Sequence, residues 1–131
     1  SGQLTDKVAL VTGASSGIGR ATALIFAKEG ARVVVADVDT KGGNETVAMI
    51  KKNGGEALFV RANVAIPSDV EAMVSKTIDN YGELNCAVNN AGVRTRVRTQ
   101  VHELPEDAWE QVISRGQSRF PLPAWGISHN I

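Results

Sequence analysis

The apolar residues of this chain form short runs that alternate with segments of helical periodicity. The runs are nearly continuous, which is typical of strands buried on both faces of a parallel sheet. Strands are predicted over residues 7–12, 32–37, 57–62 and 84–88. Helices are predicted over residues 17–29, 40–53, 68–81 and 105–114. This order predicts an α/β protein with a doubly wound parallel sheet, three α/β/α layers and right-handed crossovers.

Two polar positions are predicted to cap these helices. Thr40 is placed to cap the second helix, because its hydroxyl can accept from a free amide of the first turn. Ser68 and Glu71 fit a capping box at the start of the third helix, where each side chain would bond the backbone amide of the other residue.

A glycine-rich turn joins the first strand to the first helix. It reads Thr12-Gly13-Ala14-Ser15-Ser16-Gly17-Ile18-Gly19. Gly13 supplies a tight turn, Gly17 lets a diphosphate approach the amides of the helix N-terminus, and Gly19 lets the helix pack closely on the sheet. Ser15 and Ser16 add hydroxyl donors. The spacing differs from both G-x-G-x-x-G and the P-loop, so a purely structural turn is the alternative to nucleotide binding.

An acidic residue ends the second strand. Asp37 lies 18 residues after Gly19, close to the spacing at which a carboxylate accepts from the adenosine ribose hydroxyls. Such a carboxylate repels the additional phosphate of NADP, and Ser16 carries no charge to attract it. We therefore expect NAD to be preferred, with Val38 beside Asp37 in the site. The alternative is that Asp37 or Asp39 only solvates the strand end.

Asn89-Asn90-Ala91-Gly92 follows the fourth strand. Together with Thr12-Gly13-x3-Gly17-Ile18-Gly19, it resembles the short-chain dehydrogenase/reductase family over residues 4–114. The resemblance implies a Rossmann-like sheet, truncated to strands one to four of the usual seven. It implies that Asn90, Ala91 and Gly92 contact the cofactor, and that Asn63-Val64 takes the place of the family's usual Asp-Val beside the adenine. The predicted cofactor-binding residues are Gly13, Ser15, Ser16, Gly17, Ile18, Gly19, Asp37, Val38, Asn63, Val64, Asn90, Ala91 and Gly92.

The family transfers hydride between a nicotinamide and an alcohol or ketone, using a serine, a Tyr-x3-Lys pair and an asparagine. None of the four can be placed here. The only tyrosine is Tyr81, which is followed four residues later by Asn85, and the last lysine is Lys76. Gly116 occupies the position expected for the family asparagine. Two hypotheses remain: an NAD-dependent oxidoreductase of which this chain retains the cofactor-binding half, or a catalytically inactive nucleotide-binding fragment or regulator.

The pattern changes after Ser114. Pro121 and Pro123 interrupt the sequence where the family helix should continue. We therefore predict a cofactor-binding part over 1–114 and an unrelated tail over 115–131, with translation out of frame or alternative exon usage as interpretations. Without later strands, the fourth strand becomes an open edge beside exposed apolar surface, which favours dimerisation or aggregation. The tail offers Phe120, Leu122, Trp125 and Ile127 to cover it.

Composition narrows the function classes. The 14 basic and 14 acidic residues give a net charge of zero, which argues against a nucleic-acid partner. No apolar run reaches the ~18–20 residues of a membrane span. The single cysteine, Cys86, excludes an internal disulfide and is predicted to be a core thiol. We expect a cytoplasmic protein with no metal site, a small-molecule alcohol or ketone substrate and, by resemblance, homo-oligomeric assembly.

Overall fold

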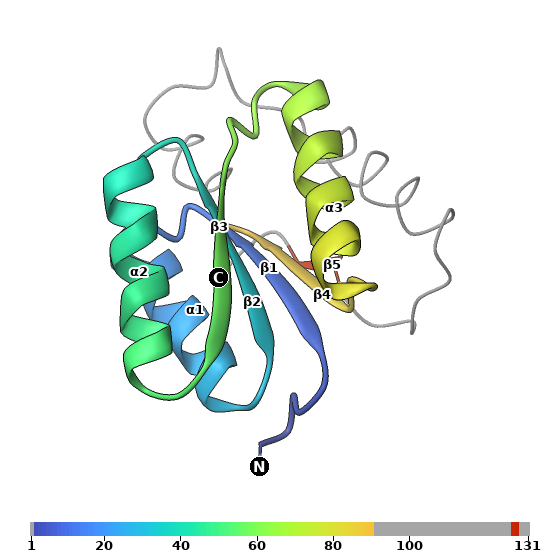
Figure 1. The fold of residues 1–131 in the computed structure, drawn as a ribbon. Coiled ribbons are helices and arrows are strands. Elements are labelled where there is room, and N and C mark those ends of the chain that lie inside the picture. Colours follow the sequence, from blue (N-terminus) through green and yellow to red (C-terminus); the bar gives the residue numbers. More distant parts are fainter. Residues whose placement is uncertain (1, 91–126, 129–131) are drawn as a thin grey trace.

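The computed structural model describes residues 2–90 and 127–128. They form a parallel sheet with helices on both faces (Figure 1). The elements are β1 (Val8–Thr12), α1 (Gly17–Lys28), β2 (Arg32–Asp37), α2 (Thr40–Lys52), β3 (Glu56–Arg61), α3 (Pro67–Tyr81), β4 (Cys86–Asn89) and β5 (Ile127–Ser128). The predicted α/β/α architecture is confirmed. The predicted helix over 105–114 lies outside the described residues.

The strand order explains where a ligand would sit. The sheet runs β3-β2-β1-β4-β5, so the chain moves outward from β1 on one side through β2 and β3, and then crosses to β4 on the other. All described strand pairs are parallel. The carboxyl ends of β1 and β4 therefore flank a topological switch point, which is where open α/β sheets bind ligands.

The continuous apolar strands are buried on both faces, as predicted. Leu10 and Val34 face α3, where they pack with Met73. Their neighbours Val11 and Val35 face the opposite side and pack in the core formed with α1 and α2. Alternate residues of each strand thus serve two cores, which explains why polar residues do not interrupt these runs.

Two predicted helix starts are wrong. Asp39, not Thr40, caps α2: its carboxylate accepts from the Gly42 amide at 2.9 Å, and Thr40 is already helical. The predicted capping box at Ser68 does not form, because α3 begins at Pro67 with Ile66 at the cap position. Proline is pre-organised for the first helical position, so it draws the start of the helix ahead of Ser68.

The prediction of an unpaired edge at β4 is also wrong. Residues 127–128 pair with β4 in parallel, with Ala87 opposite Ile127 and Val88 opposite Ser128. A short segment of the tail therefore continues the backbone ladder beyond β4. At the other edge of the sheet, β3 begins with Glu56 and ends with Arg61. Both residues are exposed and charged, which opposes pairing of this strand with another chain.

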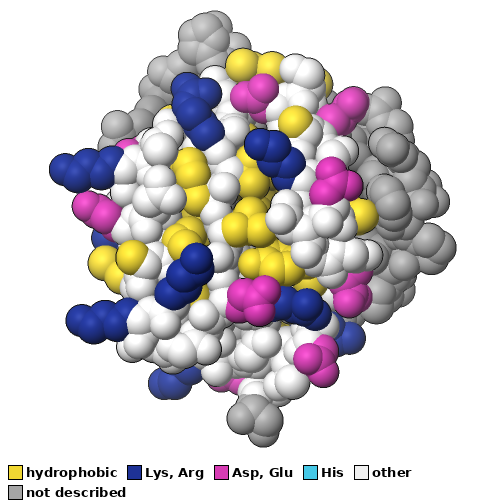
Figure 2. Space-filling model, viewed as in Figure 1, with side chains coloured by type: hydrophobic (Ala, Val, Ile, Leu, Met, Phe, Trp, Pro, Cys, Tyr) yellow, Lys and Arg dark blue, Asp and Glu magenta, His cyan; other side chains and the backbone are white. Residues whose placement is uncertain are grey.

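Figure 2 shows the molecule from the side seen in Figure 1, with apolar side chains surrounded by both positive and negative groups.

Candidate cofactor-binding site

The glycine loop between β1 and α1 has the geometry expected of it. Gly13 and Gly17 have φ angles of 64° and 58°, in the left-handed region that favours glycine. Among residues 2–90 and 127–128, no atom lies within 4 Å of the position that a Cβ on Gly17 would take, so these residues leave the space in front of Gly17 open. A Cβ on Gly19 would collide with the Gly13 carbonyl and lie 2.9 Å from Asn90 Nδ2. Gly17 thus provides access, whereas Gly19 provides close packing.

The N-terminus of α1 offers backbone donors that have no acceptor among the described residues. Ser16, at the cap position, makes no side-chain hydrogen bond to the helix amides, and the first turn contains no acidic residue. Ser16, Gly17 and Ile18 are exposed. The unpaired amides and the positive end of the helix dipole suit an anionic group such as a diphosphate.

Asp37 lies at the carboxyl end of β2, directly beside this loop. Its Oδ2 accepts from the Ser15 amide at 3.2 Å, and its Oδ1 accepts from the Asp39 amide at 3.0 Å. The residue is only 5% exposed. The alternative of a solvated strand end therefore does not describe Asp37.

Two asparagines bring the end of β4 to the same place. Asn89 accepts through Oδ1 from the Thr12 hydroxyl at 2.8 Å, which joins the ends of β4 and β1. Asn90 donates through Nδ2 to the Gly13 carbonyl at 3.4 Å. Both asparagines are buried. The structure thus brings the Asn-Asn motif against the glycine loop, while Ala91 and Gly92 lie outside the described residues.

This geometry has a counterpart among known proteins. A family model described as short chain dehydrogenase matches residues 7–117. The chain belongs to the short-chain dehydrogenase family. It is 45% identical over 111 residues to the short chain dehydrogenase/reductase astE of Aspergillus oryzae, covering 84% of this chain and 42% of that relative. It therefore spans less than half of the length of that protein.

Two solved structures share the fold. One is a hydroxysteroid dehydrogenase from Escherichia coli, with a TM-score of 0.74 and 26% identity over 88% of this chain and 54% of that chain. The other is a metagenomic short-chain oxidoreductase in complex with NADP, with a TM-score of 0.65 and 35% identity over 68% of this chain and 40% of that chain. The predicted family and fold class are confirmed.

Asn63 bonds locally in the loop that follows β3. Its Oδ1, which was expected to face the adenine, accepts from the Ala65 amide at 2.9 Å. Its own amide donates to Asp69 Oδ2 at 2.9 Å. The loop after β3 is thus held by its own residues, and Asp69 was not identified from the sequence. A carbonyl oxygen has a second lone pair, so contact between Asn63 and an adenine stays a prediction.

Two apolar side chains are exposed beside the loop. Ile18 is 60% exposed at the start of α1, and Val38 is 51% exposed immediately after Asp37. Val64, by contrast, is buried. Ligand sites are commonly lined by apolar side chains around a few placed polar groups. Ile18 and Val38 therefore suit contact with the apolar faces of a ligand.

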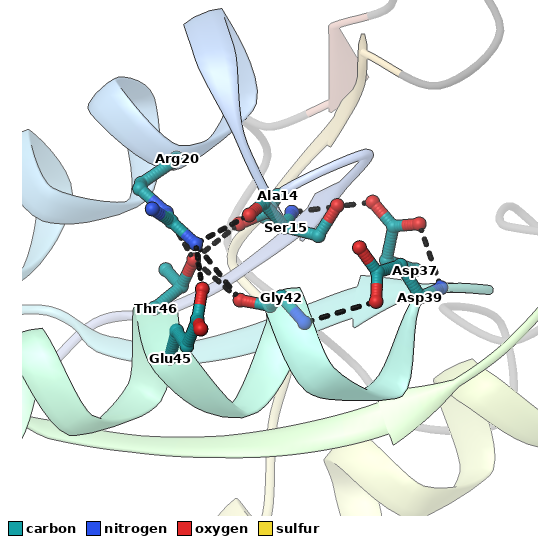
Figure 3. Close-up of polar contacts among 8 residues, drawn as sticks. All are labelled: Ala14, Ser15, Arg20, Asp37, Asp39, Gly42, Glu45 and Thr46. Carbon is teal, nitrogen blue, oxygen red and sulfur yellow. Dashed lines mark hydrogen bonds and ion pairs between the residues drawn. The ribbon is translucent and has the colours of Figure 1, made fainter.

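Arg20 and Thr46 form a polar network behind the loop that sequence reasoning missed (Figure 3). The network links α1 and α2 through the Ala14 and Ser15 carbonyls. One indication of it exists in the sequence. Arg20 lies near the start of a helix, where a cation is unfavourable unless other groups pair with it.

The groups with shifted pKa values do not belong to this site. Burial raises the pKa of Tyr81, Glu56 raises it further, and Arg32 opposes the shift. The Arg32 guanidinium lies 5.6 Å from the centre of the Tyr81 ring. Arg32 begins β2 and Asp37 ends it, so Tyr81 lies at the opposite edge of the sheet. Cys86 is buried, as predicted, and burial raises the pKa of its thiol.

Residues 2–90 and 127–128 contain no cluster of three histidine, cysteine or acidic residues that could hold a metal ion. In the same part of the chain, no helix is both long and apolar enough to cross a membrane.

Proposed function

We propose that residues 1–114 form the cofactor-binding half of an NAD-dependent oxidoreductase acting on a small-molecule alcohol or ketone. The observation that carries this proposal is the Asp37 carboxylate, held by the Ser15 amide beside the exposed N-terminus of α1. A dinucleotide needs an anion site and a ribose acceptor next to each other, and this edge of the sheet supplies both. When bound, the nicotinamide supplies the hydride acceptor or donor.

Different residues of the chain bind different parts of the dinucleotide. The amides at Ser16 and Gly17 hold the diphosphate, and the glycine backbone lets it approach closely. Asp37 accepts from the adenosine ribose hydroxyls, while Val38 and Asn63 lie beside the adenine. Asn90 supports the loop through the Gly13 carbonyl. These roles fit the donors and open space around the loop.

The preference for NAD follows from charge. A 2′-phosphate on the ribose brings roughly −1.5 to −2 charges, and it would face the Asp37 carboxylate. The nearby Arg20 guanidinium donates to the Ser15 and Gly42 carbonyls and pairs with Glu45. The chain therefore repels NADP at this position without a free cation from Arg20 to offset the repulsion.

We also propose that the protein works in the cytoplasm as a homo-oligomer. The single cysteine, which is buried and free, suits a reducing compartment. Self-association is supported by family membership.

The second candidate function is a catalytically inactive nucleotide-binding fragment or regulator. The observation that favours it is the position of the only tyrosine. Tyr81 packs with Arg32 at the far edge of the sheet, and the sequence contains no Tyr-x3-Lys. Both candidates share the same cofactor site, so catalysis alone separates them.

Two measurements test these candidates. Fluorescence titration compares NADH and NADPH binding to the wild type and to Asp37→Ala. We expect the substitution to weaken NADH binding about tenfold, equivalent to about 1.4 kcal/mol, and to reduce the preference over NADPH. An unchanged preference would contradict the role of Asp37. A turnover assay with mixed alcohols and NAD distinguishes the oxidoreductase from the silent fragment.

A further inference from the structure

The glycine loop is held from behind by two side chains that do not face the proposed cofactor site. The Thr46 hydroxyl, on α2, donates to the Ala14 carbonyl at 2.7 Å. It also accepts from Arg20 Nε at 2.9 Å. Arg20, on α1, reaches the Ser15 carbonyl through its terminal nitrogen, and the same nitrogen donates to the Gly42 carbonyl at 3.1 Å. Figure 3 shows these contacts on the side of the loop away from Asp37.

Planarity of the peptide bond converts these contacts into control of the loop amides. In a trans peptide, the carbonyl and the N–H of the next residue point in opposite directions. Holding the Ala14 carbonyl toward α2 therefore turns the Ser15 N–H away from α2, where it donates to Asp37. Holding the Ser15 carbonyl likewise turns the Ser16 N–H toward the exposed side of the loop.

The geometry points to Arg20 and Thr46 as positioning residues for cofactor binding. Thr46 orients the Ser15 amide and, through it, the Asp37 carboxylate. Arg20 orients the Ser16 amide toward the diphosphate. This inference rests on the proposed function, because it assumes that a dinucleotide binds at this loop. A contact between α1 and α2 would therefore determine how the backbone amides of the cofactor site are oriented.

Burial separates the contacts of Thr46 and Arg20 with the loop from the more exposed ion pair with Glu45. Thr46 is completely buried, and Arg20 has a side chain that is 22% exposed. The Arg20–Glu45 ion pair spans 3.3 Å, with Glu45 half exposed, and exposed pairs of this kind contribute little. The bond from Thr46 to the Ala14 carbonyl is buried, and the bond from Arg20 to the Ser15 carbonyl is partly buried. A Cβ on Gly42 would lie 2.8 Å from Ser15 Cβ, so the helix also approaches the loop closely.

The first test removes the Thr46 hydroxyl without changing its shape. Thr46→Val leaves the Ala14 carbonyl without its partner. We expect NADH affinity to fall about fivefold, the equivalent of one hydrogen bond. The preference for NADH over NADPH should fall as well, because the Asp37 carboxylate loses its orientation. Thr46→Ser retains the hydroxyl and should restore both values.

The matched control is Thr77→Val. Thr77 is also completely buried on a helix, and its hydroxyl donates to the Met73 carbonyl at 2.9 Å. It lies on α3, on the other face of the sheet. The same loss of a buried hydroxyl there should lower the denaturation midpoint and leave the NADH to NADPH preference unchanged.

The second test is Arg20→Met, with the exposed Lys28→Met on the same helix as its control. Arg20→Met should weaken NADH and NADPH by similar factors, because both carry the diphosphate. Lys28→Met should leave both affinities unchanged. If Thr46→Val does not fold, the nucleotide affinities of Arg20→Met, compared with those of Lys28→Met, test the positioning role by themselves.

The outcomes are distinguishable. Wild-type protein that binds neither nucleotide would overturn the proposed function, and this inference with it. Wild-type binding that Thr46→Val and Arg20→Met leave intact would overturn this inference alone. Weakened binding in these variants, with unchanged affinity in Thr77→Val and Lys28→Met, would support it.

Discussion

Substituting Gly19 by alanine tests whether α1 must approach the end of β1 as closely as it does. A Cβ at this position would overlap the Gly13 carbonyl and lie 2.9 Å from Asn90 Nδ2. Ordinary contacts between heavy atoms are about 3.5–4.0 Å, so the start of α1 must move by on the order of 1 Å. Such overpacking costs about 1–3 kcal/mol. Replacing a helical glycine by alanine recovers about 1 kcal/mol of helix propensity.

The net expectation is a loss of roughly 0–2 kcal/mol in the free energy of unfolding. NADH affinity should fall by at least about tenfold, or about 1.4 kcal/mol, because the displaced amides are those proposed to hold the diphosphate. Urea denaturation followed by circular dichroism measures the first quantity, and NADH fluorescence measures the second.

Gly82→Ala is the control for a change of stability without a change of site. Gly82 ends α3 with a φ of 81°, and a Cβ there would meet no atom of the described residues within 4 Å. The substitution should cost about 1–2 kcal/mol of backbone strain and leave NADH affinity unchanged. A Gly19→Ala variant that gained stability and bound NADH like the wild type would refute the close approach.

Two further predictions concern stability. Asp39→Ala should destabilise the protein by about 1 kcal/mol in chemical denaturation, because it removes the cap of α2, whereas Thr40→Ala should have a much smaller effect; equal effects would restore Thr40 as the cap. Burial raises the pKa of the Cys86 thiol above its ordinary value of 9.0. The folded protein therefore favours the protonated thiol, and this contribution to stability is fully present below pH 9.0. As the pH rises above that value, the unfolded chain ionises first and the free energy of unfolding declines. Cys86→Ala should therefore show a shallower decline in denaturant titrations between pH 8 and roughly pH 10, and an unchanged slope would contradict this.

Much of the fold was predictable because its determinants are local. Continuous apolar runs identified β1 to β4, and glycine positions marked where α1, α2 and α3 end. The helix caps were harder, because Asp39 and Thr40 are adjacent and both residue types can cap a helix. In α3, Pro67 takes the first helical position, so the expected cap at Ser68 falls inside the helix.

The parts that could not be predicted depend on contacts between distant residues. The Thr46 hydroxyl meets the Ala14 carbonyl across 32 positions, and no periodicity relates them. The pairing of β5 with β4 joins residues 40 positions apart, as with Ala87 and Ile127. A local bond was also missed: Asn63 Oδ1 accepts from the Ala65 amide two residues on, as short polar side chains commonly do. Contact between Asn63 and an adenine stays a prediction.

Every role proposed for these residues depends on a dinucleotide binding at the glycine loop. The most direct measurement is a titration of the isotopically labelled chain with NADH, followed residue by residue through its amide resonances. We predict that the largest shifts occur at Gly13, Ser16 and Gly17. The amides of Gly30 and Gly54, at the opposite edge of the sheet, should stay unchanged. Shifts centred on Gly30 and Gly54, or no shifts at all, would contradict it.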